Sequence, residues 1–123
     1  MPAPFRQAAR GNYLPGRAGN IAYIVVHYTG NRGDTAENNA LYFAREWTGT
    51  SAHYFVDQGE VWQSVRDEDT AYHCGSSHPV HPSCRNYNSI GVEMCDSVGA
   101  VPAATMARTA ALVRELMGRY NIP

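Results

Sequence analysis

Residues 21–30 read IAYIVVHYTG, and the class of fold can be argued from this stretch. An unbroken run of apolar and aromatic residues leads to His27, and Thr29-Gly30 then breaks the pattern. A strand that is apolar on both faces is typical of the interior of a parallel or mixed sheet. Its ending on an imidazole indicates that His27 lies at the rim of the sheet, where α/β proteins bind ligands and metals. Taken alone, such a histidine is more readily explained as a half-buried ring bonded to a backbone carbonyl.

The size and charge of the chain exclude several classes of protein. Its 123 residues predict one domain, and no apolar run approaches the roughly 18 residues that a membrane span needs. The ten basic residues are scattered arginines and the net charge is −1, so no nucleic-acid footprint is predicted. Residues 1–6 lack the apolar core of a signal peptide. The sequence does not specify an oligomeric state.

The remaining elements predict an α/β fold, with a single mixed β-sheet flanked by helices. Residues 1–20, rich in Gly, Pro, Ala and Arg, are expected to form an irregular N-terminal arm, and residues 21–123 the domain. Loop-rich residues 66–88 are long enough to suggest a functional rim. Strands are predicted over 21–28, 52–56, 61–65 and 89–95, and a turn joins the second and third of them. One helix is capped by Asp34 or Thr35 and ends near Glu46, and the last helix begins at Pro102.

Side-chain spacing predicts which helix faces are buried, and cysteine spacing leaves two readings open. In the last helix the apolar positions recur at three- and four-residue steps, which predicts one face that covers the sheet. An odd number of cysteines argues against a complete disulfide framework, although Cys74 and Cys84 are near enough in sequence to pair. Cys95 lies in an apolar strand and is predicted to be a core residue. The predicted helix face comprises Met106, Ala110, Val113, Met117 and Tyr120.

Two polar side chains in apolar strands accompany His27. Glu93 lies among Ile90, Val92 and Met94, where a carboxylate is costly unless it is paired, hydrogen-bonded or used in chemistry. Strand alternation places it on a face with two small residues, which leaves room in front of it. His53 begins a strand that should pair near the first strand. Two imidazoles and a carboxylate at neighbouring strand ends suit metal-assisted hydrolysis, while pairing of Glu93 with a buried arginine is the structural alternative.

Four segments carry a resemblance to a known family. Residues 24–30 (IVVHYTG), 51–56 (SAHYFV), 72–75 (YHCG) and 86–93 (NYNSIGVE) resemble the type 2 N-acetylmuramoyl-L-alanine amidases, relatives of phage lysins and of peptidoglycan recognition proteins. The resemblance extends over about residues 20–123, with the segments in family order. It implies an amidase-like fold and zinc-dependent hydrolysis of the amide between the muramic-acid lactyl group and L-alanine in peptidoglycan. The action would be on the cell wall, with release of the phage-lysin kind.

The resemblance also implies roles for individual residues. The family's first zinc ligand matches His27, and its acid–base carboxylate matches Glu93. The position of His53 is a tyrosine in some relatives, and we expect His53 to donate to the tetrahedral oxyanion. Substrate contacts are implied for Tyr28, Thr29, His73 and Asn88.

The chain departs from the family pattern at its end. The family takes its other zinc ligands from a segment that resembles His-x-Asp-x-x-Gly-x-x-Cys-Pro, whereas this sequence ends at Pro123. One protein ligand does not hold a catalytic zinc, which normally needs three. We expect a fragment of a longer enzyme. The alternatives are a substitute ligand set from Cys74, His78, His81 and Cys84, with His73 beside it, or a non-catalytic peptidoglycan-binding module.

Overall fold

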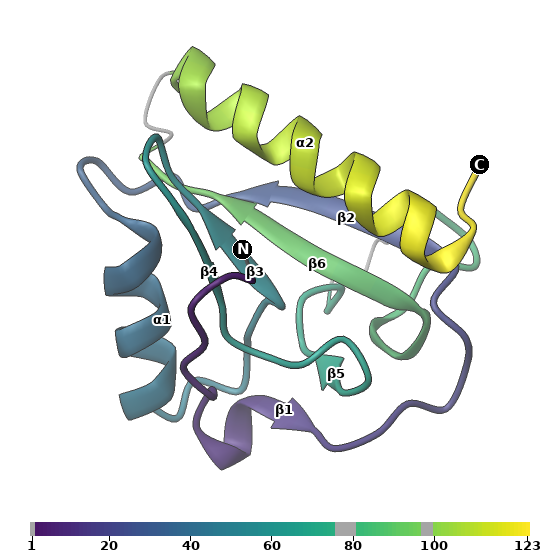
Figure 1. Ribbon diagram of the computed structural model, residues 1–123. Helices are drawn as coiled ribbons and strands as arrows, with labels where there is room; N and C mark the ends of the chain where they lie inside the picture. The colour runs from purple at the N-terminus through teal and green to yellow at the C-terminus, as the bar shows by residue number, and fades with distance from the viewer. Residues whose placement is uncertain (1, 76–80, 97–99) are drawn as a thin grey trace.

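The computed structural model describes residues 2–75, 81–96 and 100–123, and shows a four-stranded mixed sheet with helices against it (Figure 1). This confirms the α/β class predicted from the sequence. The strand order is β2-β6-β3-β4, and each strand lies within the range expected for it. The elements are β2 (Tyr23–Tyr28), α1 (Ala36–Arg45), β3 (Tyr54–Val56), β4 (Val61–Gln63), β6 (Ser89–Met94) and α2 (Ala103–Tyr120).

The central strand of the sheet is β6, which pairs in parallel with both β2 and β3. Strand β4 pairs antiparallel with β3 through the predicted turn, in which Asp57 Oδ1 accepts from two backbone N–H groups. The strand after His53 lies near the first strand in the same sheet, as expected, with β6 between the two. The register sets His27 and Phe55 on either side of Glu93.

The two faces of the sheet have different covers. On one face the apolar side chains of β3 and β6 pack against Leu116 of α2, which crosses the sheet in Figure 1. On the other face α1 lies against β3 and β4, with Phe43 stacked on Phe55. Because α1 covers only that half of the sheet, the same face of β6 and β2 is left for the loop that carries His73.

Helix α1 begins as the sequence predicts. Thr35 is its N-cap, and the hydroxyl oxygen accepts the N–H of Asn38 at 3.0 Å. Glu37 lies in the first turn, where the helix dipole favours an anion. Trp47 lies beyond the end of the helix and is mostly exposed.

The buried face of helix α2 is only partly the predicted one: Tyr120 packs against the core as expected. Met106 and Ala110 are exposed, while Thr105, Thr109 and Leu116 are buried. The periodicity of apolar residues does not identify the two threonines as buried, because threonine is counted as a polar residue. A threonine in a helix can nevertheless satisfy its hydroxyl within the helix, and Thr109 donates to the carbonyl of Thr105 at 2.8 Å.

The N-terminal arm is more ordered than the sequence indicates. A 3₁₀ turn (Arg10–Asn12) leads into β1 (Tyr13–Leu14), which pairs antiparallel with β5 (Thr70–Ala71). Asn12 is fully buried, and its side-chain amide donates to the carbonyls of Phe43 and Glu46 at 2.9 and 2.7 Å. Its amide oxygen accepts the N–H groups of the turn after α1. The side chain of Asn12 therefore anchors the N-terminal arm to the C-terminal end of α1 by hydrogen bonds.

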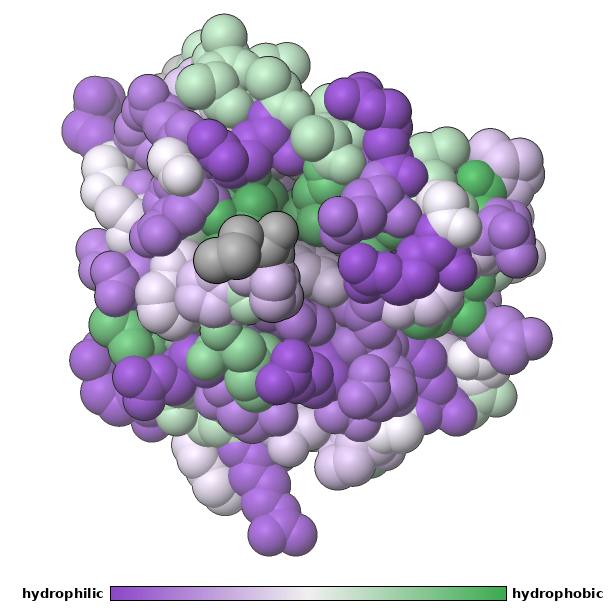
Figure 2. Space-filling view, viewed as in Figure 1, coloured by the Kyte–Doolittle hydropathy of each residue, from purple (hydrophilic) through white to green (hydrophobic). Residues whose placement is uncertain are grey.

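The visible surface is mainly hydrophilic, with apolar residues in small separate groups (Figure 2). Within the described part of the chain, no helix is both long and apolar enough to cross a membrane.

The role of Asn12 gives a stability prediction. In Asn12→Asp, a carboxylate replaces the amide that donates to two carbonyls, so both carbonyls lose their donor and face a negative charge. We expect the free energy of unfolding at pH 7 to fall by about 3 kcal/mol. Urea unfolding followed by circular dichroism measures it. The matched control is Asn38→Asp at an exposed position in the first turn of α1, where a change below about 1 kcal/mol is expected. Equal effects of the two substitutions would contradict the anchoring role.

Candidate active site

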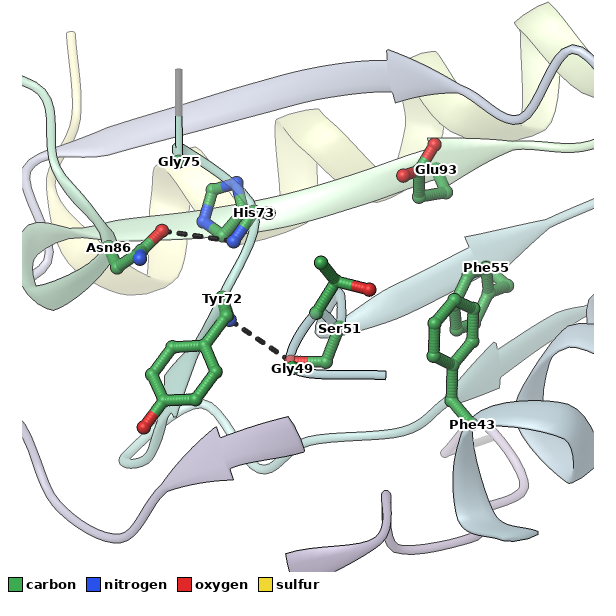
Figure 3. Close-up of a pocket in the computed structure, with 10 residues that line it drawn as sticks. Phe43, Gly49, Ser51, Phe55, Tyr72, His73, Gly75, Asn86 and Glu93 are labelled. Carbon is green, nitrogen blue, oxygen red and sulfur yellow. Dashed lines mark hydrogen bonds between the residues drawn. The ribbon is translucent and has the colours of Figure 1, made fainter. Parts of the chain in front are cut away.

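An open cavity of about 520 Å³ lies where α1 ceases to cover the sheet (Figure 3). Glu93 of β6 and Phe55 of β3 form its floor, and His73 stands over β6 beside them. The walls come from the turn after α1 and from the loop after β5. Its lining residues are Phe43, Gly49, Thr50, Ser51, Phe55, Tyr72, His73, Gly75, Asn86 and Glu93.

Glu93 carries a carboxylate that is both buried and incompletely bonded. Burial, with a smaller contribution from the Asp34 carboxylate, raises the pKa of Glu93 to about 7. Its Oε1 atom is buried and has no hydrogen-bond partner among the described residues. The predicted arginine partner is not observed there. A carboxylate with a pKa near neutrality, facing a cavity, is suited to accept and return a proton.

His27 and His73 meet beside Glu93, although they lie 46 residues apart in the sequence. Nε2 of His27 is 3.0 Å from Nδ1 of His73, and the rings meet edge to face. Burial lowers the pKa of His27, and burial followed by the nearby cationic groups lowers the pKa of His73 to about 3. Both rings are therefore neutral at pH 7, the form in which imidazole binds metals.

His73 lies on β6 because residue 91 is glycine. A Cβ atom at Gly91 would be 2.7 Å from Cγ of the His73 ring, which is closer than real Cβ contacts come. The loop that carries His73 is held by Asn86, whose Oδ1 accepts the N–H groups of His73 and Cys74 at 2.9 and 2.7 Å. A glycine inside an apolar strand was the sequence signal for this close approach.

His53 shares the face but not the cavity. Its ring is fully buried, Nδ1 accepts the N–H of Gly91, and Nε2 is 2.9 Å from the carbonyl oxygen of Asp69 and 3.0 Å from Nη2 of Arg17. Because Nδ1 accepts, Nε2 carries the proton and donates it to Asp69, which leaves no ring proton for an oxyanion. Burial lowers the pKa of His53 to about 4. This geometry does not support the expected oxyanion role, and His53 instead ties β3 and the loop before β5 to β6.

Of the four expected substrate contacts, His73 lines the cavity, whereas Tyr28, Thr29 and Asn88 do not. Tyr28 is mostly exposed and, by strand alternation, faces away from the side that carries His27. Thr29 follows it and accepts from the N–H of Asn31. The amide of Asn88 is used within its own loop, where it bonds Arg85 and Ser83. Asn86, two residues earlier, lines the cavity and was not identified from the sequence.

The three cysteines are free thiols, so the disulfide considered between Cys74 and Cys84 is not formed. The two thiols do interact with each other, and burial raises the pKa of Cys74. Cys95 is buried in the core as predicted. His78, a member of the substitute ligand set, lies outside the described residues.

Comparison with known proteins agrees with this geometry. Residues 17–123 match the sequence profile of the N-acetylmuramoyl-L-alanine amidase domain. The chain belongs to this amidase family. Amidase CwlL of Bacillus licheniformis is 35% identical over 109 residues, which are 80% of this chain and 30% of that protein. Amidase XlyA of Bacillus subtilis is 33% identical over 113 residues, which are 90% of this chain and 37% of that protein. The chain thus spans about a third of these curated relatives.

Solved amidase structures share the whole described architecture. PlyL superposes with a TM-score of 0.83 at 30% identity, over 100% of this chain and 77% of that one. The catalytic domain of XlyA superposes with a TM-score of 0.81 at 29% identity, over 100% of this chain and 80% of that one. The amidase-like fold predicted from the sequence motifs is confirmed.

The residue types present in the cavity are suitable as ligands for the metal ion of this amidase family. His27 offers a neutral imidazole, and the unpartnered buried oxygen of Glu93 lies in the next strand at the same register. The match falls short in number, because among residues 2–75, 81–96 and 100–123 no three His, Cys, Asp or Glu side chains are grouped to hold a metal ion. A catalytic zinc takes three protein ligands.

The raised pKa of Glu93 predicts how stability depends on pH. Its pKa is about 7 in the fold against an ordinary 4.5, so the fold loses stability as the pH rises from about 4.5 to about 7, and the full cost is present above pH 7. Glu93→Gln removes that cost. We expect the variant to be more stable than the parent by roughly 2–3 kcal/mol at pH 8, with the gain shrinking to near zero at pH 4.5 as the parent carboxyl becomes protonated. Urea unfolding with EDTA across this range measures the difference. Glu60→Gln, at an exposed turn position, is the control, and a pH-independent gain in Glu93→Gln would contradict the raised pKa.

Proposed function

We propose that this domain hydrolyses peptidoglycan at the amide between the lactyl group of N-acetylmuramic acid and L-alanine. The observation that carries the proposal is the Glu93 carboxyl group, which faces the cavity with a pKa of about 7 and an unpartnered oxygen. Membership of the amidase family supports the choice of bond. The cavity is open, as a site for a branched polymer must be.

The chemistry of the chain's own residues follows from their positions. Ionised Glu93 accepts a proton from the attacking water as oxygen bonds to the lactyl carbonyl carbon. When the tetrahedral intermediate collapses, Glu93 returns the proton to the leaving nitrogen, so that a free lactyl carboxyl group and the amino group of L-alanine result. Phe43 and Phe55, which stack at the cavity wall, exclude water from the side of Glu93 that faces β3.

Zinc dependence is the second part of the proposal. His27 would hold the ion through one imidazole nitrogen, and the ion would polarise the scissile carbonyl and acidify the attacking water. The described residues supply fewer than the required ligands, so we derive no reaction step through the metal.

The setting proposed for the activity is the bacterial cell wall. Endolysin PlyTW of Staphylococcus phage Twort, 28% identical over 89 residues, is among the relatives and supports a lysin-type role. Peptidoglycan is accordingly the proposed partner.

The proposed amide hydrolysis is tested by incubating the protein with purified peptidoglycan. We expect new N-terminal L-alanine, detected by amino-group labelling and mass spectrometry, without new reducing sugar ends. Glu93→Gln should lower the rate by about 10²–10⁴-fold, the usual contribution of a general base. Glu60→Gln, which exchanges the same groups at an exposed turn, should retain the parental rate. An unchanged rate in Glu93→Gln would rule out its role, and wall binding without release of alanine termini would favour a non-catalytic binding module.

The proposed role of His27 as a zinc ligand is tested by titrating the metal-free 123-residue chain with Zn²⁺. With His27 as the ligand contributed by the described residues, we expect calorimetry to give a dissociation constant weaker than about 1 μM, far from complete structural sites. His27→Ala should weaken it at least about tenfold, whereas His81→Ala should not. Tight binding lost in His81→Ala but kept in His27→Ala would instead locate the ion in the loop that carries Cys74 and Cys84.

A further inference from the structure

The serine hydroxyl beneath His73 determines where the proton of the His73 ring lies. Ser89 Oγ donates its single proton to the carbonyl oxygen of Arg85 at 2.7 Å. The same oxygen is 3.0 Å from Nε2 of His73, and because its proton goes to the nearer acceptor, the Arg85 carbonyl, it accepts from this nitrogen. His73 therefore carries its proton on Nε2, and its Nδ1 atom has a lone pair.

That lone pair in turn determines the proton of His27. Nδ1 of His73 is 3.0 Å from Nε2 of His27, with the rings nearly perpendicular at 84°. Since Nδ1 of His73 accepts, Nε2 of His27 must be the donor, and the lone pair of the neutral His27 ring lies on Nδ1. No described residue hydrogen-bonds that Nδ1 atom. The thiol of Cys74, 3.5 Å from Nδ1 of His73, is at most a weak second donor to it.

The His73 ring acts from a fixed position. Gly91 leaves no Cβ beneath it, and Oδ1 of Asn86 accepts its backbone N–H. Ser89 is fully buried at the start of β6, two residue pairs from the row that contains Gly91 and on the same face of the strand. The relay from the Arg85 carbonyl through Ser89 and His73 to His27 is thus built on the central strand of the sheet.

We propose that His73 is a positioning residue for His27, and that the Ser89–His73 relay holds His27 as the Nε2–H tautomer with Nδ1 presented as the metal-binding atom. The sequence motif had indicated a substrate contact for His73. The metal part rests on the function proposed above, whereas the tautomer of His27 is a property of the chain without metal. Partners of this kind fix the tautomer and orientation of metal-binding histidines.

The tautomers can be read directly in the metal-free chain. We expect long-range ¹⁵N–¹H correlation spectra of the ¹⁵N-labelled protein at neutral pH to show His27 and His73 each as a single Nε2–H tautomer. His81 is an internal reference, because its Nδ1 accepts the N–H groups of Ser83 and Cys84 and leaves the proton on Nε2. A proton on Nδ1 of His27 in the parent protein would overturn the proposal.

Two variants test whether the relay causes this state. Ser89→Ala removes the acceptor of the His73 proton, and His73→Gln removes the ring, so in both we expect His27 to become a mixture of tautomers. Ser83→Ala, whose side chain is exposed in the same loop, is the matched control and should leave His27 unchanged. If His27 keeps a single Nε2–H tautomer in both variants, His73 does not position it.

Titration with Zn²⁺ alone separates this proposal from the proposed function. His73→Gln should weaken zinc binding about 10–100-fold relative to the parent and to Ser83→Ala, as loss of such a partner does. Equal zinc affinity in His73→Gln and the parent would overturn the positioning role towards the metal. Failure of the parent to bind zinc would overturn the metal part of the proposed function, and the tautomer spectra would still decide whether His73 positions His27.

Discussion

The parallel pairing of β6 with β2 on one side and β3 on the other is the constraint on which the site depends. Both pairings share one register, so His27, Glu93 and Phe55 form a single row across three strands. A shift of one residue in either pairing would turn that strand's side chains to the face covered by α2. The apolar side chains of Ile90 and Val92 prevent such a shift, because it would expose them. Core packing on one face thus aligns the polar side chains on the other.

The polar side chains on the face of the sheet opposite α2 differ in whether their buried atoms have hydrogen-bond partners. His53 has backbone partners for both ring nitrogens, and His73 has partners in Ser89 and His27. These buried imidazoles are neutral and satisfied, so they stabilise the arrangement of loops and strands. Glu93 has a buried oxygen without a hydrogen-bond partner among the described residues and a pKa of about 7, and these two properties are the reason for proposing it as the reactive group of the row.

Sequence reasoning succeeded where the cause is local. Apolar strands, the Thr35 cap and the turn at Asp57 each depend on neighbouring residues, and the structure confirms them. It failed where the partner is distant. The backbone partners that occupy His53 and the role of Asn86 depend on contacts between segments 12–38 residues apart. The buried face of α2 was predicted correctly at Tyr120 but not in its first half, because the hydroxyl of the buried Thr109 is satisfied inside the helix.

The energetic cost of Glu93 also bears on the choice between a hydrolase and a binding module. A glutamine at this position would fill the same space and bond sugar or peptide groups as well as a carboxylate does, without the cost of ionisation in a buried site. That cost grows as the pH rises from about 4.5 to the folded pKa of about 7 and is complete above it, where the ionised carboxylate can accept a proton from water. A binding surface gains nothing from this property, whereas general-base hydrolysis requires it. The destabilising carboxylate therefore favours catalysis as the role of the cavity.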